Sequence, residues 1–474
     1  LVVIGNGMGG ARLVEEIRRR GADALRITVY GDEPGGNYNR IMLSGVLGRH
    51  RAPDEIITHP PDWYAENDVT LRSGVRIARI DRDRNVVVDE AGNEQRYDGL
   101  VIATGSRPFV PPIPGRDHAR VRVFRTLADC RGLHDAVESV RHAVVLGGGL
   151  LGLEAASGLR ALGVDVTVLH LMPTLMEQQL DPGAGEALRA KIETLGIAVR
   201  TDARACEIRA LDETRLAGVA LEDGTLIEAD LVVICCGIVP NAELARTAGL
   251  AVERGIIVDD GLRTSDPAIY AVGECVQHRG VTYGLVEPIW EMCRVLADRL
   301  AGTAASTYRG SKISTRLKVA GVNVVAVGTR DARPGDSVAM AIEPDGRYRR
   351  AIARDGILVG AQVVGDAPAA AAFAKAYERQ APLAGSVGAF VFSIDTIVDP
   401  RAAAKVDGEE QICVCNDVSR ETIEAAIAAG ATTIELIGEA TAAGTGCGTC
   451  HPDLGKLITR GDTSARPLEH LRAG

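Results

Sequence analysis

Two glycine-rich turns constrain the fold of this chain more than any other feature. Residues 5–10 read GNGMGG and residues 147–152 read GGGLLG, and each turn follows an apolar run and precedes an Ala/Leu-rich segment. Both match the pattern G-x-G-x-x-G. In that pattern the glycines allow a tight turn, a close approach of backbone to a pyrophosphate, and packing of the helix on the strand. Each turn therefore predicts a dinucleotide-binding βαβ unit.

The segments around the two turns alternate in the way expected for an α/β protein with parallel sheets. The pattern predicts strands over residues 1–4, 26–30, 100–103, 143–146, 165–169 and 231–234, and helices over 11–20 and 150–162. From residue 311 the distribution of apolar and polar residues changes to one typical of a mixed α+β domain, with strands expected over 318–327 and 357–364. Residues 399–411 are charged and low in large apolar residues, which indicates a linker. One helix, over 420–429, is expected among the cysteines near the end.

The two units differ in the residue that should hold a ribose hydroxyl. In the first unit Asp32 and Glu33 follow the second strand, at the distance where an acid binds the ribose. In the second unit His170 stands there instead. It is either a solvent-facing residue with no role, or a sign that NADH is no longer preferred and NADPH is tolerated. Two units predict one bound flavin and one exchangeable nicotinamide, NAD(P)H, because hydride must pass between two rings held face to face.

Four of the ten cysteines form the strongest local signal near the end of the chain. Cys413-x-Cys415 is followed, after 31 residues, by Cys447-x-x-Cys450. Four thiolates hold either a [2Fe–2S] cluster or a tetrahedral zinc ion, and Cys-x-Cys is unusual for structural zinc. We rank the cluster first, zinc second and two disulfides third. The other six cysteines are scattered, which favours a reducing, cytoplasmic location.

The overall composition excludes several classes of protein. The net charge of −10 argues against non-specific binding to nucleic acid or to an anionic membrane. No segment approaches the roughly 20 apolar residues that cross a bilayer, and no signal peptide opens the chain. With 46% hydrophobic and 24% charged residues the chain is typical of a globular protein.

Several motifs together carry a resemblance to a known family. Residues 103–108 (ATGSRP), 270–274 (YAVGE) and 444–450 (GTGCGTC) accompany the two glycine turns in a fixed order. This order resembles the two-dinucleotide flavoprotein reductases. It is most similar to the FAD part of the bacterial NAD(P)H nitrite reductase large subunit and to the related electron-transfer subunit of assimilatory nitrate reductase. The likeness covers essentially the whole chain.

The resemblance implies a pyridine nucleotide-disulfide reductase-like α/β fold with two additions. An FAD-binding domain would comprise residues 1–112 and 236–310, and an NAD(P)H-binding domain residues 113–235. An α+β interface domain would follow over 311–401, and a small [2Fe–2S] module, similar to that of bacterioferritin-associated ferredoxin (BFD), over 409–462. The resemblance leaves open a homodimer or a heteromer.

The resemblance also implies roles for individual residues. FAD would contact Gly5, Gly7, Met8, Gly10, Asp32 or Glu33, Arg40, Thr104, Gly105, Gly273, Glu274, Glu287 and Pro288. NAD(P)H would contact Gly147, Gly149, Leu151, Gly152 and His170, and Glu154 would lie near the nicotinamide as the catalytic candidate. Each charged residue has a plainer alternative. Arg40 could be a surface charge, Glu274 a neighbour of a helix N-cap and Glu287 a solvated acid. Glu154 could simply complement a helix N-terminus.

The function implied by this likeness is electron transfer. NAD(P)H would reduce FAD, FAD would reduce the [2Fe–2S] cluster, and the cluster would deliver electrons to the catalytic subunit of a molybdenum nitrate reductase. The expected acceptor rests on the analogy with this family, with the lack of a sirohaem domain before Gly474 as minor support. The alternatives are a nitrite reductase large-subunit fragment, a reductase of a small redox protein, and a flavin- and zinc-binding scaffold with negligible turnover.

Overall fold

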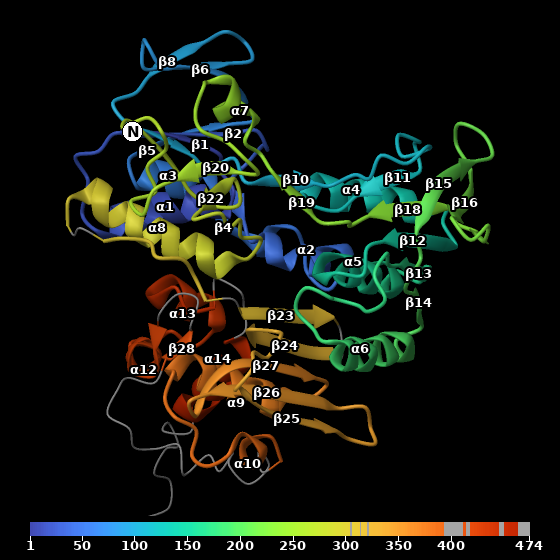
Figure 1. Ribbon diagram of the computed structural model, residues 1–474. Coiled ribbons are helices and arrows are strands. Elements are labelled where there is room, and N and C mark those ends of the chain that lie inside the picture. The colour runs from blue at the N-terminus through green and yellow to red at the C-terminus, as the bar shows by residue number, and fades with distance from the viewer. Residues whose placement is uncertain are drawn as a thin grey trace, which may run out of the picture. The chain divides into compact units, whose positions relative to one another are not determined.

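The computed structural model describes residues 1–303, 306–312, 314–319, 322–392, 411–413, 418–444 and 450–462 (Figure 1). The chain divides into two compact units, Leu1–Asp399 and Pro400–Gly474. Within the described part of the chain, no helix is long and apolar enough to cross a membrane.

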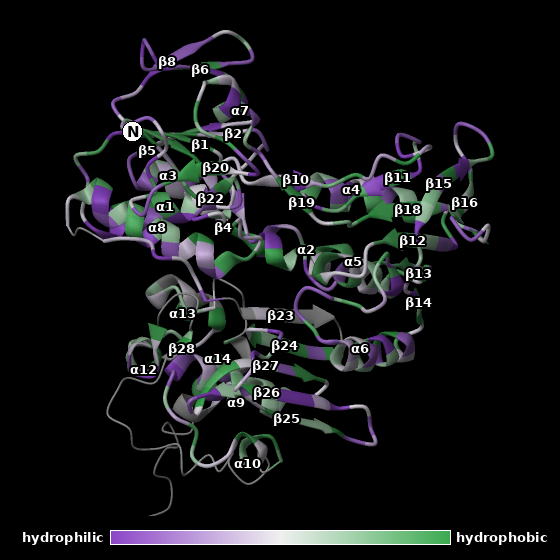
Figure 2. Ribbon diagram, in the orientation of Figure 1, coloured by the Kyte–Doolittle hydropathy of each residue, from purple (hydrophilic) through white to green (hydrophobic). Residues whose placement is uncertain are grey.

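The first glycine turn belongs to a five-stranded parallel sheet. Its strands, in spatial order, are β21 (Ile269–Ala271), β9 (Leu100–Ile102), β1 (Val2–Ile4), β2 (Ile27–Gly31) and β5 (Val69–Ser73). Helices α1 (Met8–Arg19) and α8 (Val286–Ala301) pack against each other beside it. The three residues of β1 are all buried, as expected for a strand covered on both faces. Figure 2 shows the contrast between hydrophobic β1 and hydrophilic β8 (Glu94–Arg96).

The second glycine turn belongs to another five-stranded parallel sheet. Its strands, in order, are β11 (Val121–Val123), β18 (Leu231–Ile234), β12 (His142–Leu146), β13 (Asp165–Leu169) and β14 (Ile197–Arg200). The associated helices are α4 (Leu127–Val137), α5 (Leu150–Ala161) and α6 (Pro182–Thr194). The chain leaves the first sheet along β10 (Ser106–Pro108) and returns along β19 (Ile238–Pro240), which pair in antiparallel fashion. The strands and helices predicted around both turns are thus confirmed to within a few residues.

Smaller elements complete these two sheets. Two antiparallel groups lie near the first sheet: β3 (Asn37–Tyr38) with β4 (Ile57–His59), and β6 (Ile77–Asp81) with β7 (Val86–Asp89) and β8. The parallel pair β20 (Ile256–Val258) and β22 (Val276–His278) lies there as well. A ribbon of β15 (Ala205–Ala210), β16 (Leu216–Leu221) and β17 (Leu226–Ile227) packs on the second sheet. The short helices are η1 (Arg40–Met42), α2 (Leu43–Leu47), η2 (Asp54–Ile56), α3 (Pro61–Glu66) and α7 (Glu243–Thr247).

A third sheet, antiparallel, follows in the same unit. Its order is β23 (Ser314–Val319), β24 (Val322–Gly328), β27 (Ile357–Val364), β26 (Tyr348–Arg354) and β25 (Ser337–Ile342), and α9 (Ala367–Arg379) and α10 (Val387–Phe392) pack on it. The single strand predicted over 318–327 is wrong. Two antiparallel strands occupy this region, with Val319 opposite Val322. The sequence between them includes Gly321, a turn signal that the prediction passed over.

The second unit is small and mainly helical. It contains β28 (Gln411–Cys413), β29 (Val418–Ser419), α12 (Arg420–Ala428), α13 (Ile434–Thr441) and α14 (His451–Asp462). The prediction of one helix missed α13 and α14, because glycines, alanines and threonines interrupt the pattern around them. Most of the linker predicted over 399–411 lies outside the described residues, and its last residue, Gln411, begins β28.

Asp181 joins the second sheet to the third. Its Oδ1 accepts a hydrogen bond from the backbone N–H of Ala184 (2.8 Å), which caps α6. Its Oδ2 accepts one from the Tyr348 hydroxyl (2.7 Å) and lies 3.2 Å from Nε of Arg350. The Asp181 carboxylate therefore caps α6, which packs on the second sheet, and also binds β26 of the third sheet.

We expect Asp181→Ala to lower the unfolding free energy of the Leu1–Asp399 unit by about 2–3 kcal/mol, since it removes the cap and both contacts to β26. Asp181→Asn keeps a capping oxygen and should cost about 1 kcal/mol. Thermal unfolding by calorimetry measures both. Equal losses in the two variants would contradict the role of the cap.

Candidate cofactor sites

The first glycine turn runs so close to neighbouring backbone that two of its glycines have no room for a side chain. Gly5 has a φ of +116°, and a Cβ built on it would lie 2.1 Å from the carbonyl oxygen of Ala103. A Cβ on Gly10 would lie 1.9 Å from the carbonyl oxygen of Gly5. Such distances are far inside van der Waals contact, so only glycine allows this turn.

The middle glycine of the same turn, Gly7, faces open space. Among the described residues, no atom lies within 4 Å of a Cβ built there. Gly7 is the N-cap of α1, and no described side chain caps this helix or places an acid in its first turn, which Met8 begins. The first N–H groups of α1 and the positive end of its dipole are thus left for an anion. The turn fits the pyrophosphate of FAD.

The second turn repeats the arrangement. Gly147 has a φ of +119°, and its Cβ would lie 2.3 Å from the carbonyl oxygen of Cys235. A Cβ on Gly152 would lie 1.9 Å from the carbonyl oxygen of Gly147. Gly149, the N-cap of α5, is open like Gly7, and Leu151 is the half-buried second residue of the helix. This turn fits the pyrophosphate of a nicotinamide dinucleotide.

The two predicted ribose acids of the first unit differ in their surroundings. Asp32 is exposed, whereas Glu33 is half-buried and bound by two side chains. One Glu33 oxygen accepts a hydrogen bond from the Arg40 guanidinium (2.5 Å), and the other accepts one from the Tyr38 hydroxyl (2.7 Å). The Arg40 side chain is only 22% exposed, so the alternative of a surface charge is not supported. Of the two acids, Glu33 is the one with a fixed carboxylate.

Glu274 follows β21 and pairs with Arg125, a residue that the sequence did not single out. Arg125 Nη2 contacts the Glu274 carboxylate and also donates to Ser106 Oγ (2.8 Å), which donates to Glu274 (2.8 Å). Arg40 donates to the carbonyl oxygen of Arg125 (2.9 Å). Arg125 Nε is buried and has no hydrogen-bond partner among the described residues. A buried N–H donor beside Glu274 without a hydrogen-bond partner among the described residues fits a polar group of a bound ligand. Arg125 is therefore a further cofactor-binding candidate.

The sequence around Arg125 did contain a usable signal. Thr126 Oγ1 accepts a hydrogen bond from the Asp129 N–H (3.0 Å), and Asp129 accepts one from the Thr126 N–H (2.8 Å). This capping box marks the start of α4 and fixes the residue before it. The partner of Arg125 could not be found in this way, because Glu274 is 149 residues further along the chain.

Thr104 and Gly105 leave the end of β9 and are tied to the returning strand. The Thr104 hydroxyl donates to the carbonyl oxygen of Asn241 (2.7 Å), and the Asn241 side chain donates to that of Thr104 (2.9 Å). Gly105 has a φ of +64°, and no described atom lies within 4 Å of a Cβ built on it. The segment therefore presents bare backbone beside the first glycine turn.

The remaining predicted FAD residues meet the first turn from the other side. A Cβ on Gly9 would lie 3.9 Å from Cα of Gly273 and 3.1 Å from Cγ2 of Ile289. Glu287 is half-buried in the first turn of α8, and Pro288 is buried. The structure thus brings residues from five segments, 5–10, 32–40, 104–105, 273–274 and 287–288, to one end of the first parallel sheet.

In the second unit, His170 and Glu154 are both buried. His170 is 7% exposed, which contradicts the solvent-facing alternative. Its Nδ1 accepts a hydrogen bond from the backbone N–H of Gly148 (3.0 Å), and its Nε2 lies 3.0 Å from Glu177 Oε2. Glu154 is 8% exposed and stands beyond the first turn of α5, so it does not complement the helix N-terminus.

The cysteines of the second unit are only partly described. Cys413, at the end of β28, and Cys450, just before α14, are buried. Cys415 and Cys447 lie outside the described residues, and no group of three possible metal ligands occurs within the part that is described. Helix α12 packs against α13 and α14, which gives this unit its own small core.

The cysteines near the first glycine turn are thiols that serve packing. Burial raises the pKa of Cys275, and burial raises that of Cys293 to about 12. Cys275 donates to the carbonyl oxygen of Val272 (3.3 Å) and Cys293 to that of Gly9 (3.2 Å). A protonated thiol is a poor nucleophile, so these residues are not suited to disulfide chemistry.

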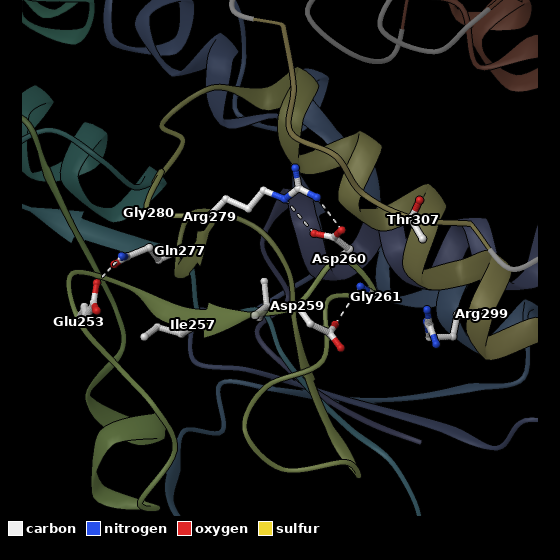
Figure 3. Close-up of a pocket in the computed structure, with 11 residues that line it drawn as sticks. Glu253, Ile257, Asp259, Asp260, Gly261, Gln277, Arg279, Gly280, Arg299 and Thr307 are labelled. Atoms are coloured by element: carbon white, nitrogen blue, oxygen red, sulfur yellow. Dashed lines mark hydrogen bonds and ion pairs between the residues drawn. The ribbon is translucent and has the colours of Figure 1, made fainter.

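A cavity of about 740 Å³ lies apart from these residues, beside β20 and β22 (Figure 3). Two of its acids are bound by neighbouring side chains. Asp260 accepts a hydrogen bond from Arg279 (2.7 Å), and Glu253 accepts one from Gln277 (2.6 Å). None of the predicted cofactor residues lines this cavity. We therefore assign the cofactors to the glycine turns.

The open middle glycines give a matched pair of variants. Gly7→Ala should yield a folded protein that loses most of its FAD, since the new methyl group occupies the space left for the pyrophosphate. Gly149→Ala should keep FAD and bind NAD(P)H about tenfold or more weakly. Flavin absorbance and nucleotide titration measure the two effects.

The control for this pair is Gly132→Ala in α4, where a Cβ also meets no described atom within 4 Å. It should change neither FAD content nor nucleotide affinity. Full FAD content in Gly7→Ala would contradict the pyrophosphate assignment.

The chain is similar to two Bacillus subtilis (strain 168) proteins over nearly its whole length. It is 40% identical to "Nitrite reductase [NAD(P)H]", a match covering 97% of this chain and 57% of that protein. It is 36% identical to "Assimilatory nitrate reductase electron transfer subunit", covering 97% and 59%. The chain thus spans less than two thirds of either relative. Among solved structures, the ferredoxin reductase for the CYP199A2 system of Rhodopseudomonas palustris matches with a TM-score of 0.74 and 30% identity. That match covers 85% of this chain and 99% of the reductase.

Three family models match successive parts of the chain. Residues 314–381 match a rubredoxin NAD⁺ reductase C-terminal domain, and residues 411–460 match a BFD-like [2Fe–2S] binding domain. The predicted fold and the predicted cofactors, FAD, NAD(P)H and a [2Fe–2S] cluster, are confirmed by these matches and by the relatives. Residues 1–290, more than half of the chain, match the remaining model, and the chain belongs to the pyridine nucleotide-disulphide oxidoreductase family.

Proposed function

We propose that this protein oxidises NAD(P)H and passes the electrons through FAD and a [2Fe–2S] cluster to a nitrate reductase catalytic subunit, in nitrate assimilation. The observation that carries the proposal is the pair of glycine turns, each closed by neighbouring backbone and each open at its middle glycine. Two dinucleotide sites in one chain supply a donor and an acceptor of hydride. A [2Fe–2S] binding domain at 411–460 supplies the exit for single electrons.

The chain's own residues hold and orient the groups. We assign FAD to residues 1–112 and 236–310, NAD(P)H to 113–235, the interface domain to 311–401 and the cluster to 409–462, on Cys413, Cys415, Cys447 and Cys450. When bound, FAD accepts hydride from NAD(P)H and the cluster carries one electron at a time. Arg40 and Arg125 place positive charge at the FAD site, and Glu33 and Glu274 fix both guanidinium groups. Glu154 is the buried acid we assign to the nicotinamide side.

The acceptor is proposed from the relatives. One is an assimilatory nitrate reductase electron-transfer subunit, which supports a nitrate reductase catalytic subunit as partner. The second candidate is an NAD(P)H nitrite reductase, favoured by the 40% identity to the other Bacillus protein. The six cysteines of the Leu1–Asp399 unit are thiols, which supports the reducing environment of the cytoplasm.

An anaerobic titration of the iron-reconstituted protein tests the electron path. NADH or NADPH should bleach the flavin bands and then the broad iron–sulfur absorbance within seconds, because both groups lie on one path. Bleaching of the flavin alone, with zinc in the metal analysis, would contradict the proposal and favour a simple flavin reductase or a scaffold.

Adding acceptors to the reduced protein separates the two candidate partners. With a molybdenum nitrate reductase catalytic subunit, NADH oxidation should become dependent on nitrate. Dependence on nitrite in the presence of a sirohaem catalytic domain, without any response to nitrate reductase, would support the second candidate.

Cys447→Ser should lose the [2Fe–2S] cluster and keep FAD, since one of four thiolate ligands is removed from a separate unit. Iron content and the visible spectrum measure this. Cys206→Ser is the matched control, because Cys206 is exposed in β15 and should leave both cofactors in place. Full iron content in Cys447→Ser would contradict the ligand assignment.

A further inference from the structure

The second dinucleotide unit lacks an acid at the end of its second strand, where such folds bind the ribose hydroxyls. His170 stands there, after β13, and is buried. In the first unit the corresponding carboxylate is Glu33. A carboxylate nonetheless lies near the second turn, because Glu177 is 3.0 Å from the His170 ring.

The contacts of His170 fix which nitrogen carries the proton. Nδ1 accepts a hydrogen bond from the backbone N–H of Gly148, so it carries no hydrogen. A neutral imidazole then has its hydrogen on Nε2, which donates it to Glu177 Oε2. Both ring nitrogens are used within the protein. The His170 ring therefore offers no donor to a phosphate and instead connects Glu177 to the glycine turn.

The backbone holds Glu177 in place. The N–H of Met176 donates to the carbonyl oxygen of Gly148 (3.1 Å), and Met176 has a left-handed φ of +52° while being only 1% exposed. The carbonyl oxygen of Glu177 itself accepts a hydrogen bond from Arg330, which belongs to the third sheet's domain. The Glu177 side chain remains 26% exposed. Its carboxylate is thus rigidly positioned and still open to a ligand.

The surface beside this carboxylate suits the adenosine part of a dinucleotide. Leu171 and Met172 directly follow His170 and are 48% and 42% exposed, which offers apolar surface to a purine ring. Arg330, which binds the backbone of Glu177, is paired with Asp331 at 2.7 Å. A second negative charge, such as a ribose 2′-phosphate, would meet Glu177 here and gain no free cation from these residues.

We propose that Glu177, held by His170, is the carboxylate that selects the ribose of the nicotinamide nucleotide. It favours a free 2′-hydroxyl and disfavours a 2′-phosphate, so the protein prefers NADH to NADPH. The proposal rests on the proposed function, because it assumes a nicotinamide dinucleotide at the second glycine turn.

Glu177→Gln tests the proposal, since glutamine keeps an oxygen that accepts from His170 and loses only the charge. We measure the dissociation constants of NAD⁺ and NADP⁺ for the oxidised holoprotein, and the rates of flavin reduction by NADH and NADPH. The preference for the nucleotide without the 2′-phosphate should fall about tenfold, mainly through tighter binding of NADP⁺. Glu177→Asp, which restores the charge, should recover most of the preference.

Glu186→Gln is the control, because Glu186 is an exposed acid of α6 paired with Arg189. It should leave the ratio of the two constants unchanged. An unchanged ratio in Glu177→Gln, or an equal change in Glu186→Gln, would overturn the assignment of Glu177. The proposed function would still be supported in that case if the wild type binds NAD⁺. Failure of the wild type to bind either nucleotide would overturn both.

Discussion

The whole arrangement depends on two places where backbone touches backbone with no side chain between. At Gly5 and at Gly147 the chain turns with a positive φ, and a Cβ would come within 2.1 Å and 2.3 Å of the carbonyl oxygen of a neighbouring strand end. This closeness sets each helix directly above its sheet. The first N–H groups of the helix then point at the open space beside the middle glycine, where the positive end of the dipole attracts an anion.

A charge network then positions groups at the first turn. Glu33 binds Arg40, Arg40 binds the backbone of Arg125, and Arg125 binds Glu274, so each arginine is paired with an acid and the contacts join segments far apart in the sequence. The Arg125 and Glu274 side chains are only 18% and 13% exposed, so removing either one would leave the charge of its partner uncompensated. The network therefore fixes these side chains relative to one another, and it makes Arg125 a further candidate for the FAD site that we propose.

The third sheet also takes part in the nucleotide half of the molecule. Arg330 binds the backbone of Glu177, and Tyr348 and Arg350 bind Asp181 at the start of α6. These contacts hold both ends of the segment Glu177–Asp181, which follows His170. A domain without a recognisable motif of its own thus supports the residues that we propose to distinguish NADH from NADPH.

The sequence by itself determined the two glycine turns, the buried parallel strands around them and the four-cysteine pattern, because steric limits on glycine and runs of apolar residues act locally. It also named Glu33 through its spacing after the second strand, and Arg40 and Glu274 through a resemblance. Only the tertiary structure decided what these residues bind. Arg125 meets Glu274 across 149 residues. His170 proved to be a buried support of the second turn, since the fold brings the N–H of Gly148 and the carboxylate of Glu177 to opposite sides of its ring. Such pairings arise from the packing of sheets and loops, which no local pattern encodes.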